Sequence, residues 1–155
     1  MKDLAREIEE TFVADGSVAL WWLGQAGFAC KSPRGTVVYI DPYLSNSAAV
    51  TAPEFGRQLP VPIEPEDLRA DLVLVTHDHL DHLDPETIRR YPRRHSTQFV
   101  APRLAARKLR ELGVPPRQIK RVDSGEQWTW HQLTIRGVFA LPTGADVLDT
   151  TGYQL

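Results

Sequence analysis

The stretch THDHLDHLD, residues 76–84, places three of the chain's five histidines and three aspartates within nine positions. Imidazole and carboxylate groups together suit zinc, iron or manganese, whereas this set has too few oxygen donors for a dedicated calcium site. His77 and His79 lie two positions apart at the end of a predicted strand, so both rings leave it from the same side. Asp81 and His82 follow where the chain must turn. This spacing favours a metal site.

Some of these side chains also have simpler explanations. Aspartate and histidine are common where strands end, so the stretch could be a solvated polar loop. Asp84 stands before Pro85 and a helical pattern, and we predict that it is the N-cap of that helix. Asp41 ends the strand pattern VVYID. It either supports the site from behind the ligands or is only a turn residue before Pro42.

A mixed α/β fold must position this stretch. The continuous apolar run ADLVLV before it is typical of a buried central strand. Upstream, three short strands are predicted at residues 18–23, 28–31 and 36–40, and residues 45–65 are expected to form a long loop that borders a site. Downstream, DPETIRRYP and PRLAARKLRELGV predict helices, while STQFVAP and EQWTWHQLTIRGVFALP predict strands.

The second helix and the first strand each suggest how the layers pack. One face of the helix is predicted to carry Leu104, Ala105, Lys108, Leu109 and Leu112, with Gly113 just beyond its end. Trp21 and Trp22 point to opposite faces of their strand, which predicts a sheet covered on both sides. The basic stretches RRYPRRH and RKLRELGVPPRQIKR either attract a phosphorylated substrate or form solvated helix faces.

Composition excludes several classes of function. Hydrophobic residues at 42% and charged residues at 25% describe a soluble globular domain, and the net charge of −2 gives no reason to expect a nucleic-acid or membrane partner. Cys30 is the single cysteine, so the chain has no intramolecular disulfide and no cysteine-rich zinc module. The N-terminal pattern lacks the apolar core of a signal peptide. We therefore expect a cytoplasmic protein that acts on a small molecule.

Two longer segments and the histidine motif resemble a known family. H-D-H-L-D-H resembles the H-x-H-x-D-H signature of the metallo-β-lactamase fold superfamily. WWLGQAGFACKSPRGTVVYIDPYLS resembles the opening strands of the branch that is similar to L-ascorbate-6-phosphate lactonase, and APRLAARKLRELGVPPRQIKRVDSGE resembles the stretch that follows the motif in that branch. The resemblance covers nearly the whole chain.

The resemblance implies an αββα sandwich, of which residues 1–155 would form one incomplete domain, the first half plus part of the second. It implies two divalent ions, zinc or manganese with iron as a further candidate, the first bound by His77 and His79 and the second by Asp81 and His82. Asp81 would also orient the attacking water, a metal-bound hydroxide. The implied activity is hydrolysis of a lactone or sugar-acid ester. The alternatives are a phosphodiesterase and a non-catalytic metal-binding half-domain.

The second half of this fold supplies a bridging aspartate and a final histidine, which we do not find in the sequence. His95 and His131 are expected at the surface, the latter on a strand. Asp146 and Asp149 lie in the loop where many relatives carry a histidine, and they could approach the metals. We therefore expect the front part of a longer enzyme, or a short chain that completes its sandwich by self-association.

Overall fold

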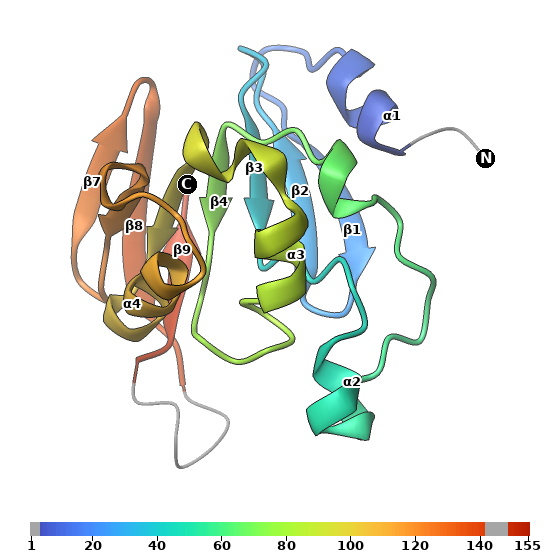
Figure 1. The fold of residues 1–155 in the computed structure, drawn as a ribbon. Coiled ribbons are helices and arrows are strands. Elements are labelled where there is room, and N and C mark those ends of the chain that lie inside the picture. The colour runs from blue at the N-terminus through green and yellow to red at the C-terminus, as the bar shows by residue number, and fades with distance from the viewer. Residues whose placement is uncertain (1–3, 142–148) are drawn as a thin grey trace.

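Two β-sheets and four α-helices make up the computed structural model, which describes residues 4–141 and 149–155 (Figure 1). The larger sheet has six strands. Across the sheet these are β1 (Ala19–Gly24), β2 (Gly27–Lys31), β3 (Val37–Ile40), β4 (Leu72–Leu74), β5 (Gln98–Ala101) and β6 (Ile119–Arg121). The first three pair antiparallel, whereas β3 to β6 run parallel. All three residues of β4 are buried, as its apolar run predicts.

The smaller sheet packs against one face of the larger one. It contains β7 (Gln127–Trp130), β8 (Leu133–Phe139) and β9 (Thr151–Gln154), all antiparallel. Between the sheets lies an apolar cluster in which Ile135 of β8 joins Val38, Leu72, Leu74 and Val100. These four residues share one face of their sheet because side chains alternate along a strand.

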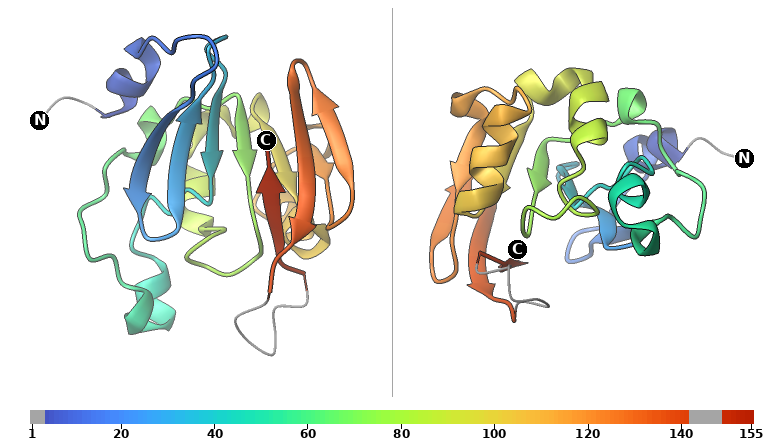
Figure 2. Two further views of the ribbon diagram at one scale, coloured as in Figure 1. Left: turned by 180° about the vertical axis from the view of Figure 1, so that it is seen from behind. Right: turned by 60° about the horizontal axis from the view of Figure 1, so that its bottom comes forward.

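Helices cover the other face of the larger sheet (Figure 2). They are α1 (Leu4–Glu10), α3 (Pro85–Arg90) and α4 (Arg103–Glu111). A second apolar cluster joins Ile8, Ile88 and Leu109 of these helices to Tyr39 and Phe99 of the strands. The order of layers is therefore helix, sheet, sheet, which is three of the four layers of the expected αββα sandwich.

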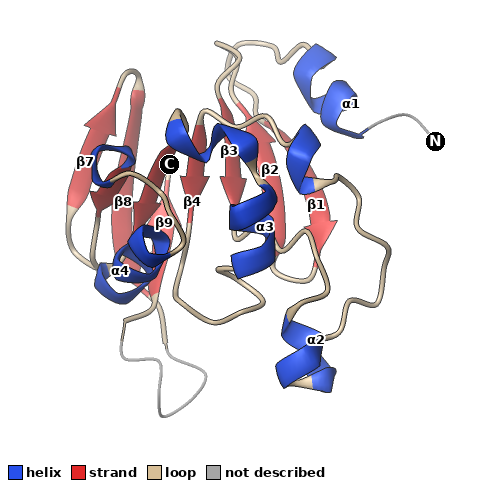
Figure 3. Cartoon of the chain, viewed as in Figure 1, coloured by secondary structure: helices blue, strands red, loops and turns tan. Residues whose placement is uncertain are grey.

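The connection between β3 and β4 is long (Figure 3). Residues 45–65 were predicted as a loop, and they contain only a short helix, α2 (Ala48–Thr51), and the 3-10 turn η1 (Pro53–Phe55); a second 3-10 turn, η2 (Pro65–Asp67), follows. Of two further 3-10 turns, η3 (Pro92–His95) follows α3 and η4 (Pro116–Gln118) precedes β6. The Arg57 guanidinium ties the long connection to the sheet, because it donates hydrogen bonds to the carbonyls of Leu23 and Tyr43.

Three features differ from the sequence predictions. The strand β6 was not predicted, since it has only three residues and two of them are basic. Trp22 is 57% exposed and Leu20 is 62% exposed, so the sheet is not covered on both sides at β1. The smaller sheet stops short of β1, which leaves that face open (Figure 2). His131 is exposed, as expected, but it lies in the turn between β7 and β8 rather than on a strand.

The parallel strands place the histidine stretch at one edge of the larger sheet. The chain leaves β4 at its carboxyl end and enters residues 76–84, which form the loop at the lower edge in Figure 1 before α3 begins. The carboxyl ends of parallel strands are where open α/β sheets usually bind ligands. Among the described residues, no helix has the length and apolar character needed to cross a bilayer.

Candidate metal centre

Three imidazole rings gather in the loop after β4. The ring centroids of His77 and His79 are 4.7 Å apart, and those of His77 and His82 are 4.0 Å apart. The backbone brings His82 back toward the other two, because its N–H and that of Leu83 both donate to the carbonyl of His79. The turn that the sequence required after His79 therefore forms, and it folds the third imidazole against the first.

A buried carboxylate lies directly behind these rings. Asp41 is 2% exposed and adopts a left-handed conformation, with φ of 43°, just after β3. Its Oδ1 accepts a hydrogen bond from the backbone N–H of Thr76 at 2.8 Å, and its Oδ2 accepts one from the Thr76 hydroxyl at 2.6 Å. The same Oδ2 lies 2.8 Å from Nδ1 of His82. Asp41 thus joins the end of β3 to two residues of the histidine loop.

This network determines which ring nitrogens face outward. A carboxylate can only accept, so Nδ1 of His82 carries the proton that points to Asp41. Thr76 gives its one hydroxyl proton to Asp41 and must accept from Nδ1 of His77, which lies 2.9 Å from it. Both rings therefore keep Nε2 away from the network. A hydrogen bond from the opposite ring nitrogen is how metal-binding histidines are usually oriented.

The protonation of the two rings differs. Burial, assisted by the neighbouring His82, lowers the pKa of His77 to about 4, so its ring is neutral at physiological pH. Burial on its own would also lower the pKa of His82. The hydrogen bond to Asp41 and the charges of Asp41 and Asp81 outweigh this effect and raise the pKa of His82. The Oδ2 atom of Asp81 lies 3.6 Å from Nε2 of His82, so these two predicted metal-ligand atoms lie close together.

Both sides of the loop are fastened to neighbouring elements. Lys108 of α4 donates from Nζ to the carbonyl of Asp78 at 2.8 Å, and Asp78 stands between His77 and His79. At the end of the loop, Asp84 is 1% exposed and caps α3 as predicted. Its carboxylate accepts from the hydroxyls of Ser45 at 2.6 Å and Ser47 at 2.7 Å, which ties the loop to the long connection after β3.

The donor set fits a divalent transition metal in its chemistry: a neutral imidazole on His77, a second ring fixed by Asp41 and the carboxylate of Asp81. Within residues 4–141 and 149–155, no three His, Cys, Asp or Glu side chains surround one common ion position. The family resemblance implies four ligands in the histidine motif, two for each ion. Each ion would therefore need further donors from outside the described residues.

The remaining sequence candidates lie outside the histidine loop. His95 is exposed on η3, as expected. The carboxylate of Asp149 accepts a hydrogen bond from the backbone N–H of Leu104 at the start of α4, and its approach to the metals stays a prediction. Asp146 lies outside the described residues. Sequence reasoning missed Thr76 and the contact of Lys108. A lysine on the apolar face of a helix was the one signal that could have indicated the latter.

Comparison with known proteins identifies the family. Residues 36–152 match the family model described as "Beta-lactamase superfamily domain". The chain belongs to this family. A UPF0173 metal-dependent hydrolase of Polynucleobacter asymbioticus is 37% identical over 111 residues, which cover 68% of this chain and 34% of that protein. A probable L-ascorbate-6-phosphate lactonase of Salmonella newport is 35% identical over 101 residues, 52% of this chain and 28% of that protein.

Solved structures agree on the fold of this member of the beta-lactamase superfamily. Igni18, a metallo hydrolase of Ignicoccus hospitalis, superposes with a TM-score of 0.62 at 21% identity, over 88% of this chain and 55% of that one. The predicted family and the predicted αββα type are therefore confirmed, with the chain matching part of the larger fold. The chain spans about a third of the length of the curated relatives that it matches.

Proposed function

We propose that this chain forms the metal-binding part of a hydrolase that opens a lactone or a related sugar-acid ester. One observation carries the proposal. The imidazoles of His77, His79 and His82 meet at the carboxyl edge of the larger sheet, and the buried carboxylate of Asp41 orients His82 from behind. A carboxylate that accepts from the opposite ring nitrogen is a usual partner of a metal-binding histidine.

Each residue would have a separate task. His77 and His79 would hold one ion, and His82 with Asp81 would hold a second. Zinc, manganese and iron all suit this set. Such ions, when bound, lower the pKa of water and polarise an ester carbonyl. Asp81 is little exposed and lies beside the ring of His82. It would orient the water and accept its proton. Asp41 and Thr76 would keep both Nε2 atoms directed at the ions.

The substrate class rests on the relatives. Two of them carry the names metal-dependent hydrolase and probable L-ascorbate-6-phosphate lactonase, at 37% and 35% identity. The matched segments cover 34% and 28% of these two proteins, so we propose that other parts of such a protein, or a second copy of this chain, complete the site. Light scattering on the purified chain tests for the second copy.

The experiment is a metal count on three proteins. We expect the unmodified chain to bind metal, up to roughly two ions where a second copy completes the site, and the His77→Ala/His79→Ala variant to bind less. A His95→Ala/His131→Ala variant is the matched control, because it removes two exposed histidines and should bind as the unmodified chain does. Equal metal content in both variants would refute the site.

Activity assays then separate the substrates. With metal present, we expect a sugar lactone to be opened to its acid, and a phosphodiester to be cleaved more slowly or not at all. Metal binding without any hydrolysis would support the non-catalytic alternative for this chain. Preferential cleavage of the phosphodiester would show that the lactone assignment is wrong, since the same donors can also hold a phosphoryl group.

A further inference from the structure

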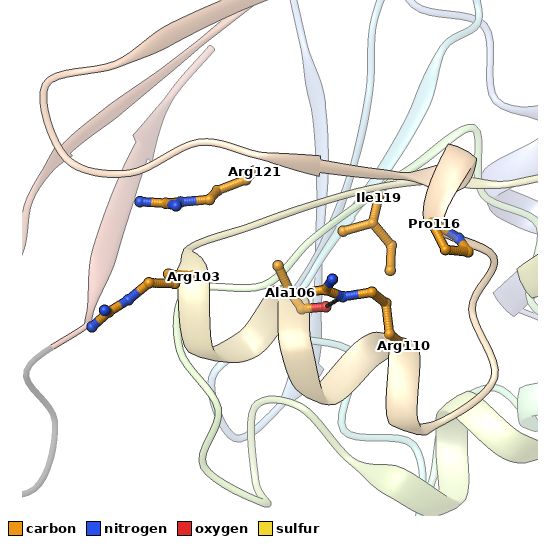
Figure 4. Close-up of a pocket in the computed structure, with 6 residues that line it drawn as sticks. All are labelled: Arg103, Ala106, Arg110, Pro116, Ile119 and Arg121. Carbon is orange, nitrogen blue, oxygen red and sulfur yellow. Dashed lines mark hydrogen bonds between the residues drawn. The ribbon is translucent and has the colours of Figure 1, made fainter.

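A concave site lies between α4 and the β6 edge of the larger sheet, and the proposed hydrolase function does not use it. The cavity has a volume of about 230 Å³ and is lined by Arg103, Ala106, Arg110, Pro116, Ile119 and Arg121. Figure 4 shows the guanidinium groups of Arg103 and Arg121 extending in the same direction at one end, while Arg110 folds back beneath Ile119.

The periodicity of both elements builds this cavity. Positions 103, 106 and 110 are three and seven residues apart, which places them on one face of a helix. Positions 119 and 121 alternate with 120 and so point to one side of β6. The side of α4 that faces the histidine loop is a different one, since Lys108 contacts Asp78 there. The cavity is therefore separate from the candidate metal centre.

The charges inside this cavity have one sign. Its lining contains three arginines and no carboxylate. Asp123 and Asp149 line a neighbouring cavity, which Arg103 and Arg121 also line. The ion pair between Asp123 and Arg121 offsets part of this charge, and a bound anion would offset the charge of Arg103 and Arg110.

Two of the arginines are already held in place. Asp123 pairs with Arg121, whose Nε lies 2.6 Å from Oδ2, and the other oxygen of Asp123 accepts from the backbone N–H of Arg103 at 3.1 Å. Arg110 donates from Nε to the carbonyl of Ala106 at 3.3 Å. A guanidinium has five N–H donors, so each of these contacts uses only part of the group. Ordered guanidinium groups bind a phosphate with a smaller loss of entropy than mobile ones.

The floor between the arginines is apolar. Ala106 is buried, Ile119 is partly buried and Pro116 begins η4 beside them. The volume is below the roughly 300–1,000 Å³ of sites for drug-sized ligands, so the ligand must be small. A ligand that matches these features has an anionic group for the guanidinium end and a compact apolar body for the floor.

We propose that this cavity binds a small phosphomonoester, with the phosphate between Arg103 and Arg121 and its apolar part on Ala106, Pro116 and Ile119. Nε and Nη2 of Arg121 contact Asp123, so the phosphate would meet the remaining N–H groups of Arg121 together with the guanidinium of Arg103. The site requires no metal and no turnover.

Calorimetric titration with phenyl phosphate and with inorganic phosphate tests the proposal. Both titrations are repeated in the His77→Ala/His79→Ala background, which removes any binding of phosphate at the metal centre. We expect phenyl phosphate to bind more tightly than inorganic phosphate by roughly tenfold, because its ring covers the apolar floor. Arg103→Gln and Arg121→Gln should each weaken phenyl phosphate binding by roughly tenfold.

The control is Arg107→Gln, which removes the same charge from α4 at a position paired with Glu111. This variant should bind phenyl phosphate as the unmodified chain does, and Arg103→Lys should retain part of the affinity. Two results would overturn the proposal: equal affinity for the two phosphates, or an equal loss in Arg107→Gln and Arg103→Gln. The second result would show that only diffuse surface charge attracts the anion.

Discussion

At the scale of single residues, one carboxylate organises the candidate metal centre. Asp41 contacts the backbone and hydroxyl of Thr76 and the ring of His82, and it does so from a left-handed backbone conformation. Aspartate and asparagine tolerate that conformation better than most residues. The position therefore combines a backbone requirement with a chemical one.

The Asp41→Asn variant separates these two requirements. The asparagine side chain would keep the size and the backbone conformation, but it would lose the negative charge that supports His82. Loss of a carboxylate behind a metal-binding histidine costs about 10–100-fold in metal affinity, and we expect a loss in that range. Competition with a chromophoric chelator measures the affinity. Asp41→Ala, which adds backbone strain, should in addition lower the melting temperature; metal binding unchanged in both variants would contradict the role of Asp41.

At the scale of elements, the histidine loop is held by a helix and by a cap. The N-cap role of Asp84 could be predicted because the evidence for it, Asp-Pro before a helical pattern, is local. The contact of Lys108 could not, since it joins residues 30 positions apart and depends on how α4 packs. The role of Asp41 could not be decided from the sequence for the same reason. An aspartate that only forms a turn and one that bonds to a histidine follow the same strand pattern, and only the pairing of the strands distinguishes them.

Lys108→Met tests the contact with the helix. The variant keeps the apolar stem on the inner face of α4 and removes the ammonium that holds the Asp78 carbonyl. We expect faster hydrogen exchange at the amides of His82 and Leu83, whose bonds to the carbonyl of His79 close the loop. Arg107→Met, one position away on the exposed face, is the control and should leave these amides unchanged. Hydrogen exchange measured by mass spectrometry compares the Lys108→Met and Arg107→Met variants.

Asp84→Ala tests the cap. It removes the acceptor for two backbone N–H groups at the start of α3 and for the hydroxyls of Ser45 and Ser47. We expect the free energy of unfolding to fall by about 2–4 kcal/mol, the sum of a lost cap and buried hydroxyls without partners. Urea denaturation measures this. Asp84→Asn, which keeps an acceptor oxygen, should lose less; equal losses would mean that the charge and not the acceptors matters.

At the scale of the whole molecule, the smaller sheet covers only part of the larger one. Packing on both sides was expected from Trp21 and Trp22, but alternation along a strand shows only that two faces exist. What covers each face depends on strands that come more than a hundred residues later. The exposed side chains of Leu20 and Trp22 on β1, with Val18 just before the strand at 65% exposure, form the uncovered strip.

This strip should govern association. We expect the unmodified chain to self-associate in solution, since contiguous exposed apolar surface promotes contact between molecules. A Leu20→Lys/Trp22→Lys variant should shift the mass found by light scattering toward the monomer, with little change in melting temperature. Val50→Lys alters a residue of α2, outside the strip on β1, that is 89% exposed, and it should have no effect on the mass. A monomeric unmodified chain would contradict this expectation.

The contacts of Asp41 and Thr76 also bear on how the protein matures. They use only protein groups, so the rings of His77 and His82 reach their orientation as the strands assemble. The conformational entropy of arranging these two ligands is then lost during folding and not during metal uptake. Folding would come first and loading second, and a chelator should strip the centre without unfolding the chain. In a cell, such a protein could persist in folded form through a period of metal scarcity and regain its ions afterwards.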